Sequence, residues 1–106
     1  MNLALGDLFA IAGKVAIVTG GSRGIGKMIA AGFVANGVKT YITARKAEAC
    51  AETAAELSQV GQCIALPADL STKEEREAFV AEIKSRESKI DILVNNAGTA
   101  WGAPFE

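Results

Sequence analysis

The sequence predicts an α/β protein with a doubly wound parallel sheet, and three observations lead to that fold class. Half of the 106 residues are hydrophobic but only 6% are aromatic, a balance typical of helices packed on a buried parallel sheet. Short β-branched runs alternate with longer segments of helical periodicity. A glycine-rich turn follows the first of these runs. Such alternation predicts right-handed βαβ crossovers within one domain.

The first half of the chain predicts a strand, a helix and a second strand. Val15–Thr19 is a continuous β-branched run that ends in glycines, so we expect a buried strand. Ile25–Val34 has apolar residues at helical spacing, and Asn36-Gly37 is expected to end that helix. Val38–Thr43 is rich in β-branched and aromatic residues, which predicts the second strand.

A second helix and a third strand follow. Lys46–Val60 is rich in Ala and Glu, and Gly61 stands where a helix-ending glycine is usual. Cys63–Pro67 is short and apolar, which predicts a strand.

The last part of the chain predicts a charged helix and a fourth strand. Ser71 and Glu74 have the spacing of a capping box, which predicts that Ser71 begins a helix ending near Ser88. Ile90–Val94 is apolar throughout, which predicts a strand buried on both faces.

Together these elements predict the spatial strand order 3-2-1-4, with ligand sites at the carboxyl ends of the strands. We expect residues 1–106 to form one half of a doubly wound domain, whose fourth strand is an apolar edge covered only by Thr99–Glu106. Such a chain on its own is expected to be marginally stable or prone to aggregation. Leu3–Ala12 is interpreted as a lead-in rather than a signal peptide, because Asp7 interrupts it and no basic segment precedes it.

Charge and cysteine content exclude several function classes. The net charge is −1, with basic and acidic residues interspersed, so neither nucleic acid nor a membrane is an expected partner. The chain has no histidine and only two cysteines, Cys50 and Cys63, which argues against a metal site. Both cysteines fall in predicted regular structure, as expected of buried free thiols in a cytoplasmic protein.

The glycine-rich turn is the first candidate site. Thr19-Gly20-Gly21-Ser22-Arg23-Gly24-Ile25-Gly26 joins the first strand to the first helix, an arrangement that lets backbone N–H groups approach a phosphate. A purely steric turn is the alternative. A P-loop reading is disfavoured, because Met28 stands where Ser or Thr would hold a magnesium ion.

Two further motifs follow the last two predicted strands. Asp69-Leu70 follows the third strand and Asn95-Asn96-Ala97-Gly98 follows the fourth. With the T-G-x-x-x-G-x-G spacing, these motifs closely resemble the short-chain dehydrogenase/reductase family, over nearly the whole chain. The resemblance implies a Rossmann-type fold in which the NADP(H) or NAD(H) dinucleotide contacts these motifs: the pyrophosphate and adenosine ribose at Gly20, Ser22, Arg23, Gly24 and Ile25, the adenine at Asp69 and Leu70, and the nicotinamide ribose side at Asn96, Ala97 and Gly98. The alternatives without a binding role are that Asp69 is only a turn residue and that the Asn pair only ends a strand.

The end of the second strand predicts which cofactor is bound. An acidic residue there would accept a hydrogen bond from a ribose 2′-hydroxyl, whereas a 2′-phosphate requires positive charge. No carboxylate stands at this point, and Arg45 is placed to make a bidentate contact to a phosphate, with Arg23 able to approach from the glycine turn. The sequence therefore predicts NADP(H), unless Arg45 and Lys46 merely solvate a helix start.

The family resemblance also implies what this chain lacks. Members transfer hydride with a Ser, a Tyr and a Lys one helical turn from the Tyr, and none of the three can be located here. Tyr41 is expected to lie in a strand and to be a packing residue. We therefore expect a half-domain truncated before the catalytic segment, able to bind cofactor but with no catalytic residue of its own.

Segments 47–53, 66–71 and 95–102 look like the 3-oxoacyl-[acyl-carrier-protein] reductase branch, including that of rhamnolipid biosynthesis. This resemblance implies NADPH-dependent reduction of an acyl thioester substrate, with a homo-tetramer or dimer only for the complete protein. Another ketone, a sugar or a steroid remains an alternative substrate, and a non-catalytic dinucleotide-sensing module is the alternative function. Trp101 would border the active site or simply cover the end of the sheet.

Overall fold

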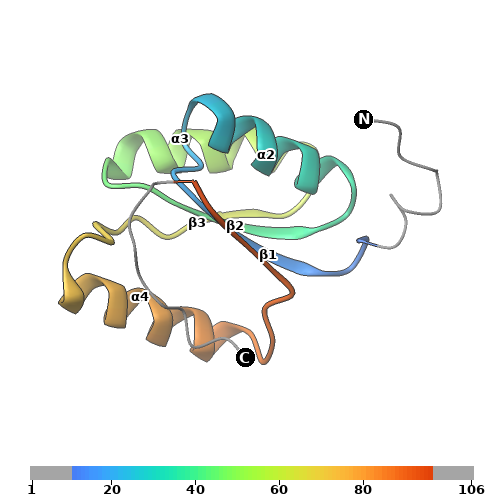
Figure 1. Ribbon diagram of the computed structural model, residues 1–106. Helices are drawn as coiled ribbons and strands as arrows, with labels where there is room; N and C mark the ends of the chain where they lie inside the picture. The colour runs from blue at the N-terminus through green and yellow to red at the C-terminus, as the bar shows by residue number, and fades with distance from the viewer. Residues whose placement is uncertain (1–10, 97–106) are drawn as a thin grey trace.

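The computed structural model describes residues 11–96 of the chain. Its four parallel strands have the order β3-β2-β1-β4, which confirms the predicted topology (Figure 1). The strands are β1 (Val15–Thr19), β2 (Lys39–Thr43), β3 (Cys63–Ala65) and β4 (Ile92–Asn95), and the helices are α2 (Gly24–Ala35), α3 (Ala47–Leu57) and α4 (Lys73–Arg86).

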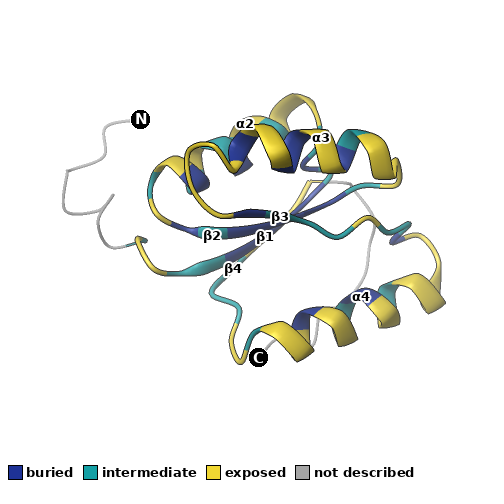
Figure 2. Ribbon diagram, turned by 180° about the vertical axis from the view of Figure 1, so that it is seen from behind, coloured by how far each residue is buried: buried dark blue, intermediate teal, exposed yellow. Residues whose placement is uncertain are grey.

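The helices cover both faces of the sheet. Helices α2 and α3 lie side by side on one face, and α4 lies on the other (Figures 1 and 2). Because side chains alternate along a strand, Val18 and Ile42 belong to the cluster under α2 and α3, whereas Ile17 and Tyr41 belong to the cluster under α4. This three-layer arrangement is the doubly wound architecture that the sequence predicts.

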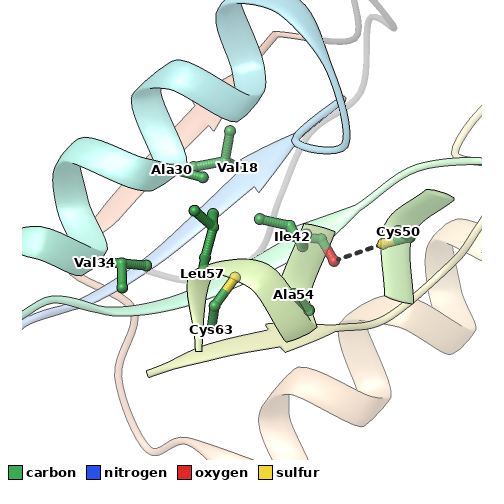
Figure 3. Close-up of a cluster of buried hydrophobic side chains, with 8 residues drawn as sticks. All are labelled: Val18, Ala30, Val34, Ile42, Cys50, Ala54, Leu57 and Cys63. Atoms are coloured by element: carbon green, nitrogen blue, oxygen red, sulfur yellow. Dashed lines mark hydrogen bonds between the residues drawn. The ribbon is translucent and has the colours of Figure 1, made fainter. Parts of the chain in front are cut away.

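The cluster under α2 and α3 contains both cysteines (Figure 3). Cys50 and Cys63 are buried free thiols, as predicted. The Cys50 Sγ lies 3.5 Å from the carbonyl oxygen of Ile42. Burial raises the pKa of the Cys50 thiol and raises that of Cys63 to about 11, so neither is an activated nucleophile.

The cluster under α4 is closed at one end by a charged group. Tyr41 is 1% exposed, and its hydroxyl donates a 2.6 Å hydrogen bond to a Glu87 carboxylate oxygen. Lys39 Nζ lies 2.6 Å from the same oxygen and 5.8 Å from the centroid of the Tyr41 ring. These contacts link the end of α4 to the start of β2, and Tyr41 is a packing residue, as expected.

Strand β4 differs from the prediction. It is not buried on both faces: its residues alternate between intermediate and exposed, and Leu93 is 40% exposed. The physical reason is that, among residues 11–96, β4 pairs only with β1. The segment Thr99–Glu106, which was expected to cover this edge, lies outside the described residues, as do Trp101 and most of the lead-in Leu3–Ala12.

The start of α4 also needs correction. The N-cap residue is Thr72 rather than Ser71, and the Thr72 hydroxyl accepts a 3.3 Å hydrogen bond from the Glu75 N–H. Ser71 instead donates its hydroxyl and its N–H to the Asp69 carboxylate, at 2.6 and 3.0 Å. Because the neighbouring pair Thr72 and Glu75 has the same capping-box spacing, the sequence pattern fits either register, and the turn at Asp69 selects the second.

Helix α3 ends earlier than predicted. Its last residue is Leu57, and residues 58–60 form turns before β3. Gly61 does not adopt the left-handed conformation of a helix-ending glycine. A Cβ at Gly61 would lie 2.8 Å from the carbonyl oxygen of Val34, so this glycine is needed for close approach to α2. At the other helix the prediction is confirmed, because Asn36 is the C-cap and Gly37 has a φ of 82°. Within the described residues, no helix is long and apolar enough to cross a membrane.

Candidate cofactor-binding site

A cleft of about 760 Å³ opens at the carboxyl ends of the strands, the edge at which ligands bind in doubly wound sheets. It lies among the turn after β1, the start of α3, the turn before α4 and the end of β4. Its lining residues are Gly20, Ser22, Arg23, Gly24, Thr43, Ala44, Arg45, Lys46, Ala49, Ala68, Asp69, Leu70, Ser71 and Asn96.

The glycine turn brings the start of α2 close against the end of β1. Gly20 and Gly24 have φ values of 64° and 59°, which side chains rarely adopt. A Cβ at Gly26 would lie 2.0 Å from the carbonyl oxygen of Gly20, so this glycine lets α2 begin directly against the end of β1. The N–H groups of Gly20 and Gly21 donate to the Thr43 carbonyl at 2.8 and 3.3 Å, which fixes the turn to β2.

Two helices begin at the cleft with cationic N-cap residues. Arg23 caps α2 and Lys46 caps α3, and in neither case does the side chain accept a hydrogen bond from the helix. The first turn of α2 contains no acidic residue, and that of α3 contains only Glu48. Helix α4, by contrast, has Thr72 as its cap and two Glu residues in its first turn. Cations at the positive end of a helix dipole are unfavourable by themselves, so the starts of α2 and α3 both add positive potential to the cleft.

Arg45 and Asp69 face the same cleft from neighbouring segments. Hydrogen bonds from Ser71 hold the pKa of the Asp69 carboxyl below its ordinary value, and the charge of Arg45 lowers it further. Asp69 is therefore ionised at neutral pH. Asp69 is a turn residue, since its carboxylate accepts hydrogen bonds from Ser71, and it also lines the cleft.

The residues after β4 connect that strand to the glycine turn. The Thr19 hydroxyl lies 3.1 Å from Asn95 Oδ1, to which it donates across the β1–β4 pair. Asn96 Nδ2 donates to the Gly20 carbonyl oxygen at 3.4 Å. Asn96 also lies within 2.7 Å of the point that a Cβ at Gly26 would occupy, so strand β4, the turn and α2 meet at one crowded point.

Most of the residues proposed from the sequence come together in this cleft. Gly20, Ser22, Arg23, Gly24, Arg45, Asp69, Leu70 and Asn96 all line it. Ile25 does not line it, and its side chain on the first turn of α2 is 66% exposed. Ala97 and Gly98 lie outside the described residues.

Sequence reasoning did not assign the remaining lining residues to the site. Lys46 could have been assigned from its place beside Arg45 at a helix start. Thr43 carries no such signal, and its hydroxyl is buried without a hydrogen-bond partner among residues 11–96. Ala44, Ala49 and Ala68 are small residues that leave room in the cleft, and composition alone does not single them out.

The described side chains are suited to binding rather than to chemistry. No group of three His, Cys, Asp or Glu residues that could hold a metal ion comes together within residues 11–96. Burial raises the pKa of the Tyr41 hydroxyl, which is opposite to the lowered pKa that a proton-transferring tyrosine requires. The cleft is lined instead by the starts of two helices and by cationic side chains, which are features that favour an anion.

The sequence pattern of the short chain dehydrogenase family matches residues 14–106. The rhamnolipids biosynthesis 3-oxoacyl-[acyl-carrier-protein] reductase of Pseudomonas aeruginosa is 52% identical over 98 residues, which are 92% of this chain and 38% of that protein.

Solved structures agree with the sequence comparison. The complex of RhlG with NADP, from Pseudomonas aeruginosa, has a TM-score of 0.81 and 50% identity over 88% of this chain and 38% of its own. A 7 alpha-hydroxysteroid dehydrogenase complexed with NADH and 7-oxo glycochenodeoxycholic acid has a TM-score of 0.79 and 34% identity over 88% of this chain and 37% of its own. The chain thus spans less than half the length of these relatives, and it belongs to the short-chain dehydrogenase/reductase family.

Proposed function

We propose that this segment is the cofactor-binding part of an NADPH-dependent reductase. The observation that carries the proposal is the pair Arg45 and Lys46, which follows β2 at the start of α3 and lines the same cleft as the glycine turn. A ribose 2′-phosphate at this point would receive charge-assisted hydrogen bonds from Arg45. It would also neutralise the cations at the N-terminus of α3.

In this proposal the two anionic groups of the dinucleotide lie at the starts of two different helices. The pyrophosphate would lie at the start of α2, where Gly20, Gly24 and Gly26 allow close approach of the backbone and Arg23 adds positive charge. The 2′-phosphate would lie at the start of α3, and the adenine at Asp69 and Leu70. Bound there, the cofactor supplies hydride, while the described residues bind it, orient it and balance its charge.

The relatives support this choice without deciding it. One solved relative is a complex with NADP and another is a complex with NADH, so the family alone does not select the cofactor. The local residues support NADP(H), because the segment between β2 and α3, residues 44–46, contains two cations and no carboxylate.

For the substrate we propose a 3-oxoacyl thioester, reduced to the 3-hydroxyacyl product. The support is the 52% identity to the Pseudomonas aeruginosa reductase of rhamnolipid biosynthesis. No catalytic residue is assigned within residues 11–96. If the full-length protein binds NADPH tightly but reduces neither 3-oxoacyl thioesters nor other ketones, the substrate proposal fails and the non-catalytic binding module is favoured.

The cofactor proposal is tested by reversing the charge of Arg45. We expect Arg45→Asp to lower the ratio of NADPH to NADH affinity by about 100-fold, because a charge-assisted contact is replaced by repulsion of the 2′-phosphate. The ratio is measured by fluorescence titration of both cofactors. Lys84→Asp makes the same change of net charge on α4, away from the lining of the cleft, and is expected to leave the ratio unchanged. An unchanged ratio in Arg45→Asp would refute the assignment.

A further inference from the structure

A residue that does not line the cleft forms a hydrogen bond to the glycine turn. Thr53 lies in the middle of α3 and is 4% exposed, and its hydroxyl donates a 2.9 Å hydrogen bond to the carbonyl oxygen of Ser22. Thr53 lies thirty-one residues away from Ser22 along the chain. Helices α2 and α3 lie side by side at this point (Figure 1), so the bond joins the body of one helix to the turn that begins the other.

The type of residue at position 53 is itself informative. Its neighbours in α3 are mostly Ala and Glu, which favour a helix more than Thr does. A threonine within a helix commonly turns its hydroxyl to a carbonyl of its own helix. Here the hydroxyl bonds instead to a carbonyl of another segment, so the position serves the glycine turn at some cost in helix propensity.

The direction of the Ser22 carbonyl matters for anion binding. A peptide unit is planar and trans, so its C=O and N–H point in opposite directions. When Thr53 holds the Ser22 carbonyl toward α3, the N–H of Arg23 points away from α3. The Gly20 carbonyl is likewise held by Asn96, and the Arg23 carbonyl by the N–H of Lys27. With these three carbonyls engaged, the turn does not present their negative ends to a pyrophosphate.

We propose that Thr53 is a positioning residue for the cofactor, acting through the Ser22–Arg23 peptide to keep the glycine turn in its anion-binding conformation. The inference rests on the proposed function, since it requires that the cleft bind a dinucleotide. It goes further by assigning a role to a buried hydroxyl outside the cleft. It also distinguishes the two anionic subsites, because the Thr53 hydroxyl holds the backbone of the glycine turn, whereas the 2′-phosphate would be held by side chains.

The test compares two ligands and three variants of the full-length protein. Thr53→Val keeps the shape of the side chain and removes the donor, whereas Thr53→Ser keeps the donor. We expect Thr53→Val to raise the dissociation constant of NADPH about tenfold, as for loss of one hydrogen bond that orients a binding group. Adenosine 2′-monophosphate, which has the 2′-phosphate but no pyrophosphate, should bind Thr53→Val within twofold of wild type. Thr53→Ser should bind both ligands as wild type does.

The control variant is Glu56→Gln. Glu56 forms a 2.8 Å ion pair with Lys27 that also joins α3 to α2, but at the surface, so it reports on loosening of the two helices without loss of the Thr53 bond. It should leave both dissociation constants unchanged. If Thr53→Val does not fold, Thr53→Ala removes the same donor.

Three results would overturn the inference while leaving the proposed function intact: equal NADPH affinity in wild type and Thr53→Val, equal weakening of both ligands, or failure of Thr53→Ser to restore binding. A wild-type protein that binds neither ligand would overturn the proposed function, and the inference with it.

Discussion

At the scale of single residues, the glycines of the turn after β1 are required for different reasons. Gly20 and Gly24 are needed for their positive φ values, and Gly26 for space. Gly21 has an ordinary φ, but a Cβ there would lie 2.7 Å from the Ile42 side chain. The sequence motif predicts a phosphate-binding turn from Gly20, Gly24 and Gly26 and leaves position 21 unspecified. It does not distinguish these causes, because spacing does not reveal which backbone dihedral or which neighbour each glycine has.

The contact at Gly26 leads to a prediction about stability. Gly26→Ala would place a methyl group 2.0 Å from the Gly20 carbonyl oxygen, so α2 must move away from β1, at a cost of about 1–3 kcal/mol in the free energy of unfolding. Gly32→Ala is the matched control in the same helix, because a Cβ there meets nothing within 4 Å. It should gain about 0.5–1 kcal/mol from helix propensity. Urea denaturation measures both changes, and equal effects of the two variants would contradict this account.

The scale of whole elements shows where sequence patterns suffice and where they do not. Strand β1 has the bounds that its β-branched run predicts. The start of α4 was displaced by one residue because Ser71-Glu74 and Thr72-Glu75 satisfy the same pattern, and only the hydrogen bonds of Ser71 to Asp69 separate them. The predicted end of α3 is wrong because Gly61 does not end the helix. This glycine is required instead for close contact with Val34 in α2, which no local sequence pattern reveals.

The link between α4 and β2 predicts how stability depends on pH. Hydrogen bonds from Lys39, and then from Tyr41, hold the pKa of the Glu87 carboxyl below its ordinary value of 4.5. A carboxyl whose pKa is lowered in the folded state stabilises the protein above its unfolded pKa, and this contribution is lost as the pH falls through the folded value. Glu87→Gln should therefore lower the free energy of unfolding by about 1 kcal/mol at pH 7. The difference from wild type should shrink as the pH falls below 4.5 and disappear only below the lowered pKa of the folded state.

The measurement is a series of urea denaturations between pH 7 and pH 3. Glu77→Gln is the matched control on the same helix, because its 3.9 Å ion pair with Lys73 is exposed on both sides and should contribute little. A Glu87→Gln difference that stays constant down to pH 3 would show that the carboxylate charge is not what links the helix to the strand.

At the scale of the whole molecule, the strand order and the position of the cleft follow from the alternation of elements, since crossovers have one hand and ligands bind where strands end. The exposure of β4 does not follow from its own apolar sequence, because burial depends on which neighbours a strand has. Similarly, Arg45 was placed in the site from its position after a strand, whereas Thr53 has no motif and becomes visible only when α3 packs beside the glycine turn.

The two cysteines provide a measure of how the whole molecule responds to cofactor. Both lie in the cluster between the sheet and helices α2 and α3 (Figure 3), and burial raises the pKa of each thiol. A thiol reagent should therefore modify them only when this layer opens. The proposed cofactor contacts the turn before α2 and the start of α3, so it stabilises the closed form against that opening. At a concentration 100 times its dissociation constant, NADPH should slow labelling about 100-fold, which corresponds to about 2.7 kcal/mol.

Variants with a single cysteine, Cys50→Ala and Cys63→Ala, should be protected by the same factor, because one cooperative layer holds both thiols. Arg45→Asp should abolish most of this protection by NADPH while leaving the labelling rate without cofactor unchanged, since Arg45 is exposed. Protection of only one cysteine would instead mean that the cofactor acts locally and does not stabilise the layer as a unit.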